Sequence, residues 1–256
     1  MKVMLIAHTP LPERTVAASA KLCYSSASID DVMDGLTDES AASFVQMLSE
    51  IGHESPIEHA VFTFGIEGVS RSLMAQITRH RIASFSVQSQ RYVKKSQFEF
   101  VTPPEIAAIP EAEAEYLRAM NEDMEHYERL TEILFDKHFA RMTAGGMDEK
   151  TARRSAEKAA IEDARFVLPN ACAVKMMVTM NARSLYNFFA HRCCARAQWE
   201  IRDLALQMLK LCVDAAPELF SRSGPPCFSD KCHEGKMSCG KMVEIRESFR
   251  KLHEKE

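Results

Sequence analysis

The chain has 256 residues, a formal net charge of −4 and 46% hydrophobic residues. This composition is typical of a globular protein and excludes a disordered or fibrous chain. The uninterrupted apolar runs are too short to span a membrane, and the short N-terminal apolar stretch is not typical of a signal peptide. Because no export signal is seen, the eight cysteines indicate reduced thiols and a cytoplasmic protein.

Hydrophobic periodicity predicts a strand at residues 2–8 and a helix at residues 38–51. Gly and Pro at residues 52–56 predict a turn, and the alternation of Phe62, Phe64 and Ile66 predicts a strand at residues 60–67. A short helix at residues 70–80 and a loop or irregular strand at residues 82–95 follow. These elements indicate that strands and helices are mixed along the chain.

In the second half, two prolines at 103–104 begin a long helical region that extends to about residue 138. Gly145 and Gly146 interrupt it, and Asp148 is a suitable N-cap for a helix at residues 149–164. A nearly apolar stretch at residues 171–180 predicts a buried strand, and helices are expected at residues 182–193 and 197–215.

These elements predict an α/β (α+β) fold in which helices flank one central sheet. We expect a single domain at residues 1–222 that includes the long helical insertion. The composition changes after Pro217, and residues 223–256 hold three of the eight cysteines together with several lysines. We therefore expect this segment to be a short C-terminal appendage.

Two stretches carry only positive charge. Residues 68–98 contain six Arg or Lys and no acid, and residues 164–199 contain five and again no acid, so the rest of the chain has a net charge of −15. Both stretches are rich in apolar and small polar residues, unlike a solvated run of charges. They indicate compact sites for anions such as phosphate.

The densest feature is Arg79-His80-Arg81, with Ser89 after seven further residues and Arg91 beyond it. Two guanidinium groups beside a histidine can bind phosphate through forked N–H donors. Taken alone, this arrangement indicates a nucleotide site.

The string from Arg79 to Tyr92 resembles the signature of flavin-dependent thymidylate synthases, which is Arg-His-Arg, seven residues and Ser. Three other stretches are similar to family segments in the same order: residues 52–59, residues 164–169, and residues 181–200 with Asn187 and Arg192. The resemblance covers about residues 1–222, and four motifs in register are far more specific than one.

The resemblance implies methylation of dUMP to dTMP, with methylenetetrahydrofolate as the carbon donor and FAD relaying hydride from NAD(P)H. It also implies a mainly antiparallel central sheet, a homotetramer with FAD at subunit interfaces, and no enzyme cysteine as nucleophile. We expect dUMP and folate as small-molecule partners, and neither a membrane nor a nucleic acid.

The resemblance also implies site residues. Catalytic roles fall to Arg192, Ser89 and His80. The cofactor-binding residues are His53, Ser55, Arg79, His80, Arg81, Val87, Asn181, Ala182, Arg183 and Asn187. The substrate-binding residues are Gln76, Ile77, Thr78, Arg79, Val87, Gln88, Ser89, Gln90, Arg91, Arg165 and Arg192. In this scheme guanidinium groups stabilise negative charge that develops on the uracil ring, and Arg192 corresponds to the arginine that favours ionisation there.

Some of these residues have alternative interpretations. Val87 stands where some family members carry an acid, and only its backbone could form a hydrogen bond. Ser89 could be a nucleophile, but a positioning role is favoured because no adjacent base is evident. His53 and His59 do not have helical metal-ligand spacing, so a flavin or structural contact is favoured for His53, and structural roles for His59 and Glu58.

The C-terminal segment offers a metal hypothesis. Cys227, Cys232, His233 and Cys239 lie within 13 residues, and three Cys with one His can bind zinc. The spacings are unusual, and adjacent Cys232 and His233 would be strained as joint ligands. The alternative favoured here is a mobile, reduced tail without a metal.

Two further function classes remain open at this stage. A non-catalytic nucleotide- or RNA-binding protein could use the two basic stretches, but it would need aromatic side chains interleaved with the cations. Phe85, Tyr92 and Phe98 are irregularly spaced, and the net charge is negative. An inactive interaction protein would be expected to lack the signature arginines, which are present.

Overall fold

The computed structural model describes residues 1–90 and 99–254. The chain divides into two compact units. The first comprises Met1–Ile66, Ala75–Ser86 and Met176–Glu256, and the second comprises Glu67–Met74 and Val87–Lys175. The C-terminal segment thus belongs to the first unit, while the limit expected at residue 222 stays a prediction.

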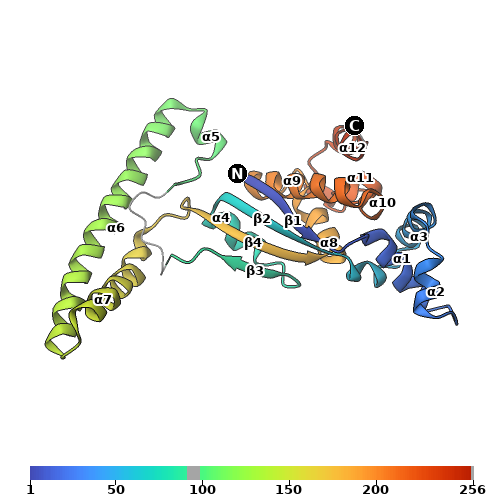
Figure 1. Cartoon of the computed structure of the whole chain (residues 1–256). Coiled ribbons are helices and arrows are strands. Elements are labelled where there is room, and N and C mark those ends of the chain that lie inside the picture. Colours follow the sequence, from blue (N-terminus) through green and yellow to red (C-terminus); the bar gives the residue numbers. More distant parts are fainter. Residues whose placement is uncertain (91–98, 255–256) are drawn as a thin grey trace. The chain divides into compact units, whose positions relative to one another are not determined.

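One four-stranded antiparallel sheet confirms the predicted mixed fold. Its order is β1 (Lys2–His8), β2 (Val61–Ser70), β4 (Ala173–Asn181) and β3 (Ser84–Val87) (Figure 1). Strands β2 and β4 each contribute residues to both units. Strands β1, β2 and β4 confirm the strands predicted at residues 2–8, 60–67 and 171–180.

Strand β2 forms because aromatic and β-branched residues alternate along it. Phe62, Phe64 and Ile66 are each fully buried, as the sequence pattern predicts. The hydroxyl of Thr63 is hydrogen-bonded to that of Thr179 on β4 at 3.0 Å. In β4 the pattern alternates, so that Met176, Val178 and Met180 are buried and Met177 is exposed.

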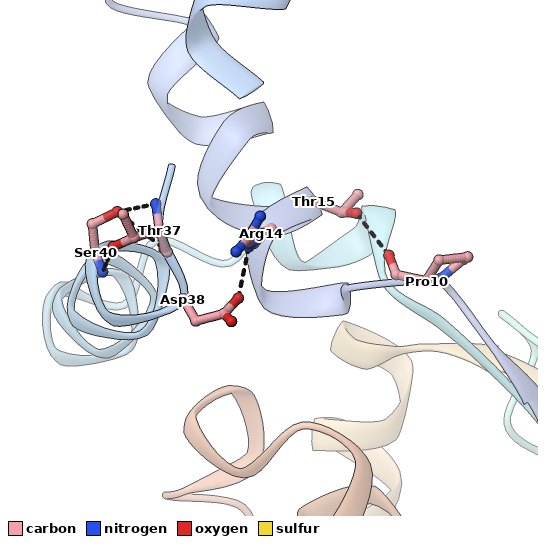
Figure 2. Close-up of polar contacts among 6 residues, drawn as sticks. All are labelled: Pro10, Arg14, Thr15, Thr37, Asp38 and Ser40. Carbon is pink, nitrogen blue, oxygen red and sulfur yellow. Dashed lines mark hydrogen bonds and ion pairs between the residues drawn. The ribbon is translucent and has the colours of Figure 1, made fainter. Parts of the chain in front are cut away.

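Helices α1 (Pro12–Leu22), α2 (Ile29–Asp34) and α3 (Asp38–Ile51) follow β1. The N-terminus of α3 has a capping box, in which Thr37 and Ser40 exchange side-chain and backbone hydrogen bonds. Figure 2 shows this box and the ion pair at 2.6 Å between Arg14 of α1 and Asp38. Helix α3 has the predicted bounds, whereas α1 and α2 were not predicted.

After α3 the chain reverses at Gly52, whose φ of 71° is left-handed. This conformation is costly for a residue with a Cβ atom, so glycine suits the C-cap. The segment then enters the short helix η1 (Pro56–His59). Helix α4 (Arg71–Ile77) lies within the predicted helix at residues 70–80 and begins directly after β2.

The first unit continues with α8 (Ala182–Arg192), α9 (Trp199–Ala215) and α10 (Pro217–Phe220). Asn181 and Gln198 cap α8 and α9 through side-chain oxygens that accept backbone N–H donors. The ring centroid of Phe220 lies 5.2 Å from that of Phe62 and 6.1 Å from that of Phe189. These contacts join β2, α8 and α10 in one aromatic core.

The second unit contains α5 (Pro104–Ala107), the 35-residue helix α6 (Pro110–Ala144), α7 (Glu149–Ala164) and η2 (Arg165–Val167). The predicted helical region is present, but Pro110 begins a separate long helix. Asp148 caps α7 as predicted. Ala152, Ala156 and Ala160 form its buried stripe, and α7 packs against α6.

The C-terminal segment is structured, contrary to the expected mobile tail. It forms α11 (Pro226–Ser229), η3 (Gly235–Met237) and α12 (Met242–His253), and α12 packs against α11 and α9. Ile245 and Phe249 of α12 are buried. The guanidinium of Arg246 donates to the carbonyl oxygens of Cys227 and Asp230, which joins α12 to the preceding turn.

We expect Phe249→Ala to destabilise the protein by about 3 kcal/mol, because removing a large buried ring leaves a cavity. Phe249 is 2% exposed, whereas Val243 on the same helix is 67% exposed. Val243→Ala is therefore the matched control and should have little effect. Denaturant unfolding of both variants measures the difference, and equal stability of the two would contradict the packing of α12.

Candidate active site

A cavity of about 1220 Å³ opens in the first unit. Among the described residues, its lining includes five arginines and two glutamates, so its wall is strongly positive. The arginines are Arg79, Arg81, Arg183, Arg192 and Arg196. Residues 79–82 after α4, Glu58 of η1, the end of β4 and much of α8 contribute to this wall, together with residues 225–227 and 232–234.

The Arg-His-Arg motif is separated from the end of α4 by one residue. The amide of His80 donates to the carbonyl of Ile77 at 3.0 Å, which closes a turn at the end of this helix. Ile77 is fully buried and anchors this turn, while Arg79 and Arg81 are exposed. All three motif residues line the cavity, as expected for a ligand-binding cluster.

His80 is the most buried member of the motif. Its Nε2 atom accepts a hydrogen bond from Nε of Arg192 at 3.2 Å, and its ring contacts Phe188 edge-on at 5.1 Å. Burial lowers the pKa of His80 to about 4, with a further contribution from the Arg192 guanidinium. His80 is therefore a neutral acceptor at neutral pH.

Arg192 lies near the positive charge of Arg79. Burial lowers its pKa, and repulsion from Arg79 lowers it further. Two guanidinium groups held within reach of each other favour an anionic ligand, because an anion relieves their repulsion. The structure thus brings together Arg79, His80 and Arg192 from sequence segments more than 100 residues apart.

Further predicted flavin-binding residues lie at the N-terminus of α8 and in its following turn. The amide of Ala182 donates to the Ala60 carbonyl, and the Asn181 side chain caps the helix. Asn181, Arg183 and Asn187 line the cavity. Ala182 and Ile77 are fully buried, and neither is among the described residues that line this cavity.

Other predicted residues of the first unit lie elsewhere. His53 lines a second, more apolar cavity of about 670 Å³ between α1, α2 and α3. Ser55 is hydrogen-bonded to His53 at 3.3 Å. Gln76 accepts the Arg79 amide through its carbonyl, and Thr78 is exposed. Among the residues that the structure describes, the lining of the first cavity includes none of His53, Ser55, Gln76 and Thr78.

The second unit holds the remaining candidates. The Gln88 amide donates to the Lys175 carbonyl, Gln90 donates to the thiol sulfur of Cys172, and Arg165 donates to the Glu162 carbonyl. Val87 and Ser89 are half-buried. Arg91 lies outside the described residues. The roles predicted for these residues stay predictions.

Several cavity residues were missed by sequence reasoning. The sequence predicts a structural role for Glu58. Arg196 is one of the five cations of the acid-free stretch at residues 164–199, without a predicted role of its own. The cavity lining also includes His191, Cys194, Pro225, Pro226, Cys227, Cys232, His233 and Glu234. The acid-free stretch was a usable signal for Arg196, whereas no local pattern indicates that residues 225–234 reach this cavity.

Across residues 1–90 and 99–254, no three His, Cys, Asp or Glu side chains are arranged to hold a metal ion. The zinc hypothesis for Cys227, Cys232, His233 and Cys239 therefore gains no support. Likewise, no helix in the described part of the chain is long and apolar enough to cross a membrane.

The Thy1 family, described as "Thymidylate synthase complementing protein", matches residues 4–218. The chain is 49% identical to a protein of Clostridium tetani, with 97% of each chain covered. It is 42% identical to a protein of Geobacter sulfurreducens, with 98% of this chain and 99% of the relative covered. Both relatives carry the name flavin-dependent thymidylate synthase. The chain belongs to the flavin-dependent thymidylate synthase family. The resemblance carried by the four motifs is thereby confirmed.

A third relative is more distant. A protein of Pyrococcus furiosus with the same name is 33% identical over 89% of this chain and 87% of its own length. The family assignment favours an enzyme over a non-catalytic nucleotide- or RNA-binding protein.

The neutral state of His80 predicts a dependence of stability on pH. The pKa of His80 is about 4 in the folded chain and 6.5 when unperturbed. As the pH falls, the imidazole is protonated in the unfolded chain before it is protonated in the folded chain. The stabilisation that comes from the neutral ring is therefore complete above pH 6.5 and is lost as the pH falls toward 4. Because the ring is only half-buried, we expect a discounted contribution of about 1–2 kcal/mol.

His80→Gln tests this dependence, because glutamine keeps an acceptor but does not titrate. Between pH 6.5 and pH 4 the free energy of unfolding should decrease in both proteins. The decrease should be about 1–2 kcal/mol smaller in His80→Gln than in the unmodified chain. His126→Gln, at an exposed position on α6, is the control. An identical pH dependence in the unmodified chain and His80→Gln would rule out the buried neutral imidazole.

Proposed function

We propose that this protein methylates dUMP to dTMP, with methylenetetrahydrofolate as the carbon donor, NAD(P)H as the reductant and FAD as the bound cofactor. The observation that carries the proposal is the arginine-lined cavity around Arg79, His80 and Arg192, in a chain of the flavin-dependent thymidylate synthase family. The homotetramer, the folate site and the cytoplasmic location stay predictions.

The cavity residues fit a flavin nucleotide. Such a ligand has anionic phosphates and a ring with hydrogen-bonding edges, and its size requires a cavity toward the upper end of the usual range of about 300–1,000 Å³. The cavity of about 1220 Å³ combines guanidinium donors with the side-chain amides of Asn181 and Asn187. We propose Arg79, Arg81, Arg183 and the two asparagines as the residues that would hold FAD.

When bound, the flavin would supply hydride transfer, which no protein side chain performs. The chain's own residues would orient the ligands and set the electrostatic field. Arg192 would stabilise negative charge that develops on the uracil carbonyl and imide, which makes carbon 6 of the ring more electrophilic. His80 would hold the Arg192 guanidinium through its neutral Nε2 atom.

This division of roles does not need a cysteine nucleophile. Burial raises the pKa of the Cys193 and Cys212 thiols, so both remain protonated at neutral pH. Cys194, Cys227 and Cys232 line the cavity, and burial also raises the pKa of Cys227. The raised pKa makes the thiols of Cys193, Cys212 and Cys227 poor nucleophiles, which is consistent with a route in which the flavin and the guanidinium groups act on the pyrimidine.

The function is tested by measuring dTMP formed from dUMP, methylenetetrahydrofolate and NADPH, with and without added FAD. We expect product only when flavin is bound. Arg192→Ala should lower the rate by about 100-fold, as when a donor to developing charge is removed, while the melting temperature changes little. Arg192→Lys keeps the charge and should retain part of the rate. Absence of product in every condition would overturn the proposed function, and a full rate in Arg192→Ala would remove Arg192 from the mechanism.

The cofactor assignment has its own test. We expect Arg79→Ala and Arg81→Ala each to weaken FAD binding by about 10-fold, because each removes a charged hydrogen-bond donor to the ligand. The visible absorbance of purified protein and a flavin fluorescence titration measure the loss. Arg118→Ala removes an exposed arginine of α6 and is the control. Unchanged flavin affinity in both motif variants would exclude these arginines as contacts.

A further inference from the structure

The guanidinium of Arg183 is held by two carboxylates. Its Nη1 atom lies 2.5 Å from Glu58, and its Nε atom lies 3.3 Å from Glu54. The hydrogen bond to Glu58 is the main reason why the pKa of Arg183 is raised. Glu54 precedes η1 and Glu58 belongs to it, so both ends of this short segment reach the same side chain.

The position of Arg183 is electrostatically unfavourable without these acids. It is the second residue of α8, and the positive end of a helix dipole disfavours a cation there. Arg183 also lines a cavity with four other arginines. Two carboxylates offset both effects and fix the direction of the guanidinium.

Stability does not explain the arrangement. The side chain of Arg183 is 51% exposed, and those of Glu54 and Glu58 are 50% and 44% exposed. Ion pairs with this exposure contribute little to the free energy of unfolding. The contacts use Nε and one terminal nitrogen, and a guanidinium has further N–H donors with which to bind a ligand in the cavity.

We propose that Glu54 and Glu58 are positioning residues that hold the Arg183 guanidinium in the orientation in which it binds the flavin. This inference rests on the proposed function, because it takes Arg183 as a cofactor contact. It assigns a positioning role to Glu58, which lines the cavity, and to Glu54. Both lie in the family-like segment at residues 52–59, for which the sequence predicts no pairing with Arg183. The shorter contact makes Glu58 the dominant partner.

A double-mutant cycle tests the proposal by FAD titration of the full-length apoprotein, with flavin fluorescence as the readout. Arg183→Gln should weaken FAD binding. Glu58→Gln should weaken it by about two- to fivefold, and it should have no further effect when Arg183→Gln is already present. Glu58→Asp keeps the charge and should retain part of the affinity. Glu50→Gln, at an exposed position near the end of α3, is the control, and the melting temperatures should be equal.

The outcomes distinguish the cofactor role of Arg183 from the positioning role of Glu58. If Arg183→Gln binds FAD as tightly as the unmodified chain, the cofactor role of Arg183 fails and the positioning role fails with it. If Arg183→Gln weakens binding but Glu58→Gln does not, or tightens it, the positioning role alone is overturned. Equal losses from Glu58→Gln in both backgrounds would also overturn it, because Glu58 would then act independently of Arg183.

Discussion

The hydrogen bond from Arg192 to a neutral imidazole is the contact on which the electrostatics of the cavity depend. His80 accepts this bond only while it is unprotonated, since a protonated ring would be a third positive group beside Arg79 and Arg192. Burial against Phe188 keeps the ring neutral. The protein thus holds two like charges near each other and leaves their repulsion to be relieved by an anion, which is how a preorganised anion site is built.

Rigid elements position these charges through their ends. Arg79 and Arg81 follow the last turn of α4, Arg183 lies in the first turn of α8, and Arg192 is the last residue of the same helix. The aromatic core formed by Phe62, Phe189 and Phe220 fixes α8 against β2. Side chains at the ends of packed elements are held more precisely than side chains on long loops, which suits a cavity that must orient two ligands.

Local signals made most of the fold predictable from the sequence. The capping residues Thr37, Asp148 and Gln198 begin the helices that the hydrophobic pattern predicted, and period-two alternation identified β2. Helix α1 was missed because it begins after Leu11, which has a positive φ of 45° and no side-chain cap. Helix α12 also lacks a side-chain cap, although its buried Ile245 and Phe249 formed a detectable pattern.

The candidate site was predictable where a motif is contiguous and less so where it depends on tertiary contacts. The Arg-His-Arg motif lines the same cavity as Arg183, Asn187 and Arg192 of α8, while the roles of these residues stay predictions. The pairing of Glu58 with Arg183 spans 125 residues in sequence, so no periodicity or spacing reveals it. The placement of His53 beside an apolar cavity likewise results from how α1, α2 and α3 pack.

The matched family segment ends at residue 218, whereas Pro225, Pro226, Cys227, Cys232 and His233 form part of the cavity wall. Part of the enclosure therefore comes from outside the stretch that defines the family. A substitution among these residues would therefore reshape one side of the enclosure while leaving the Arg-His-Arg motif unchanged.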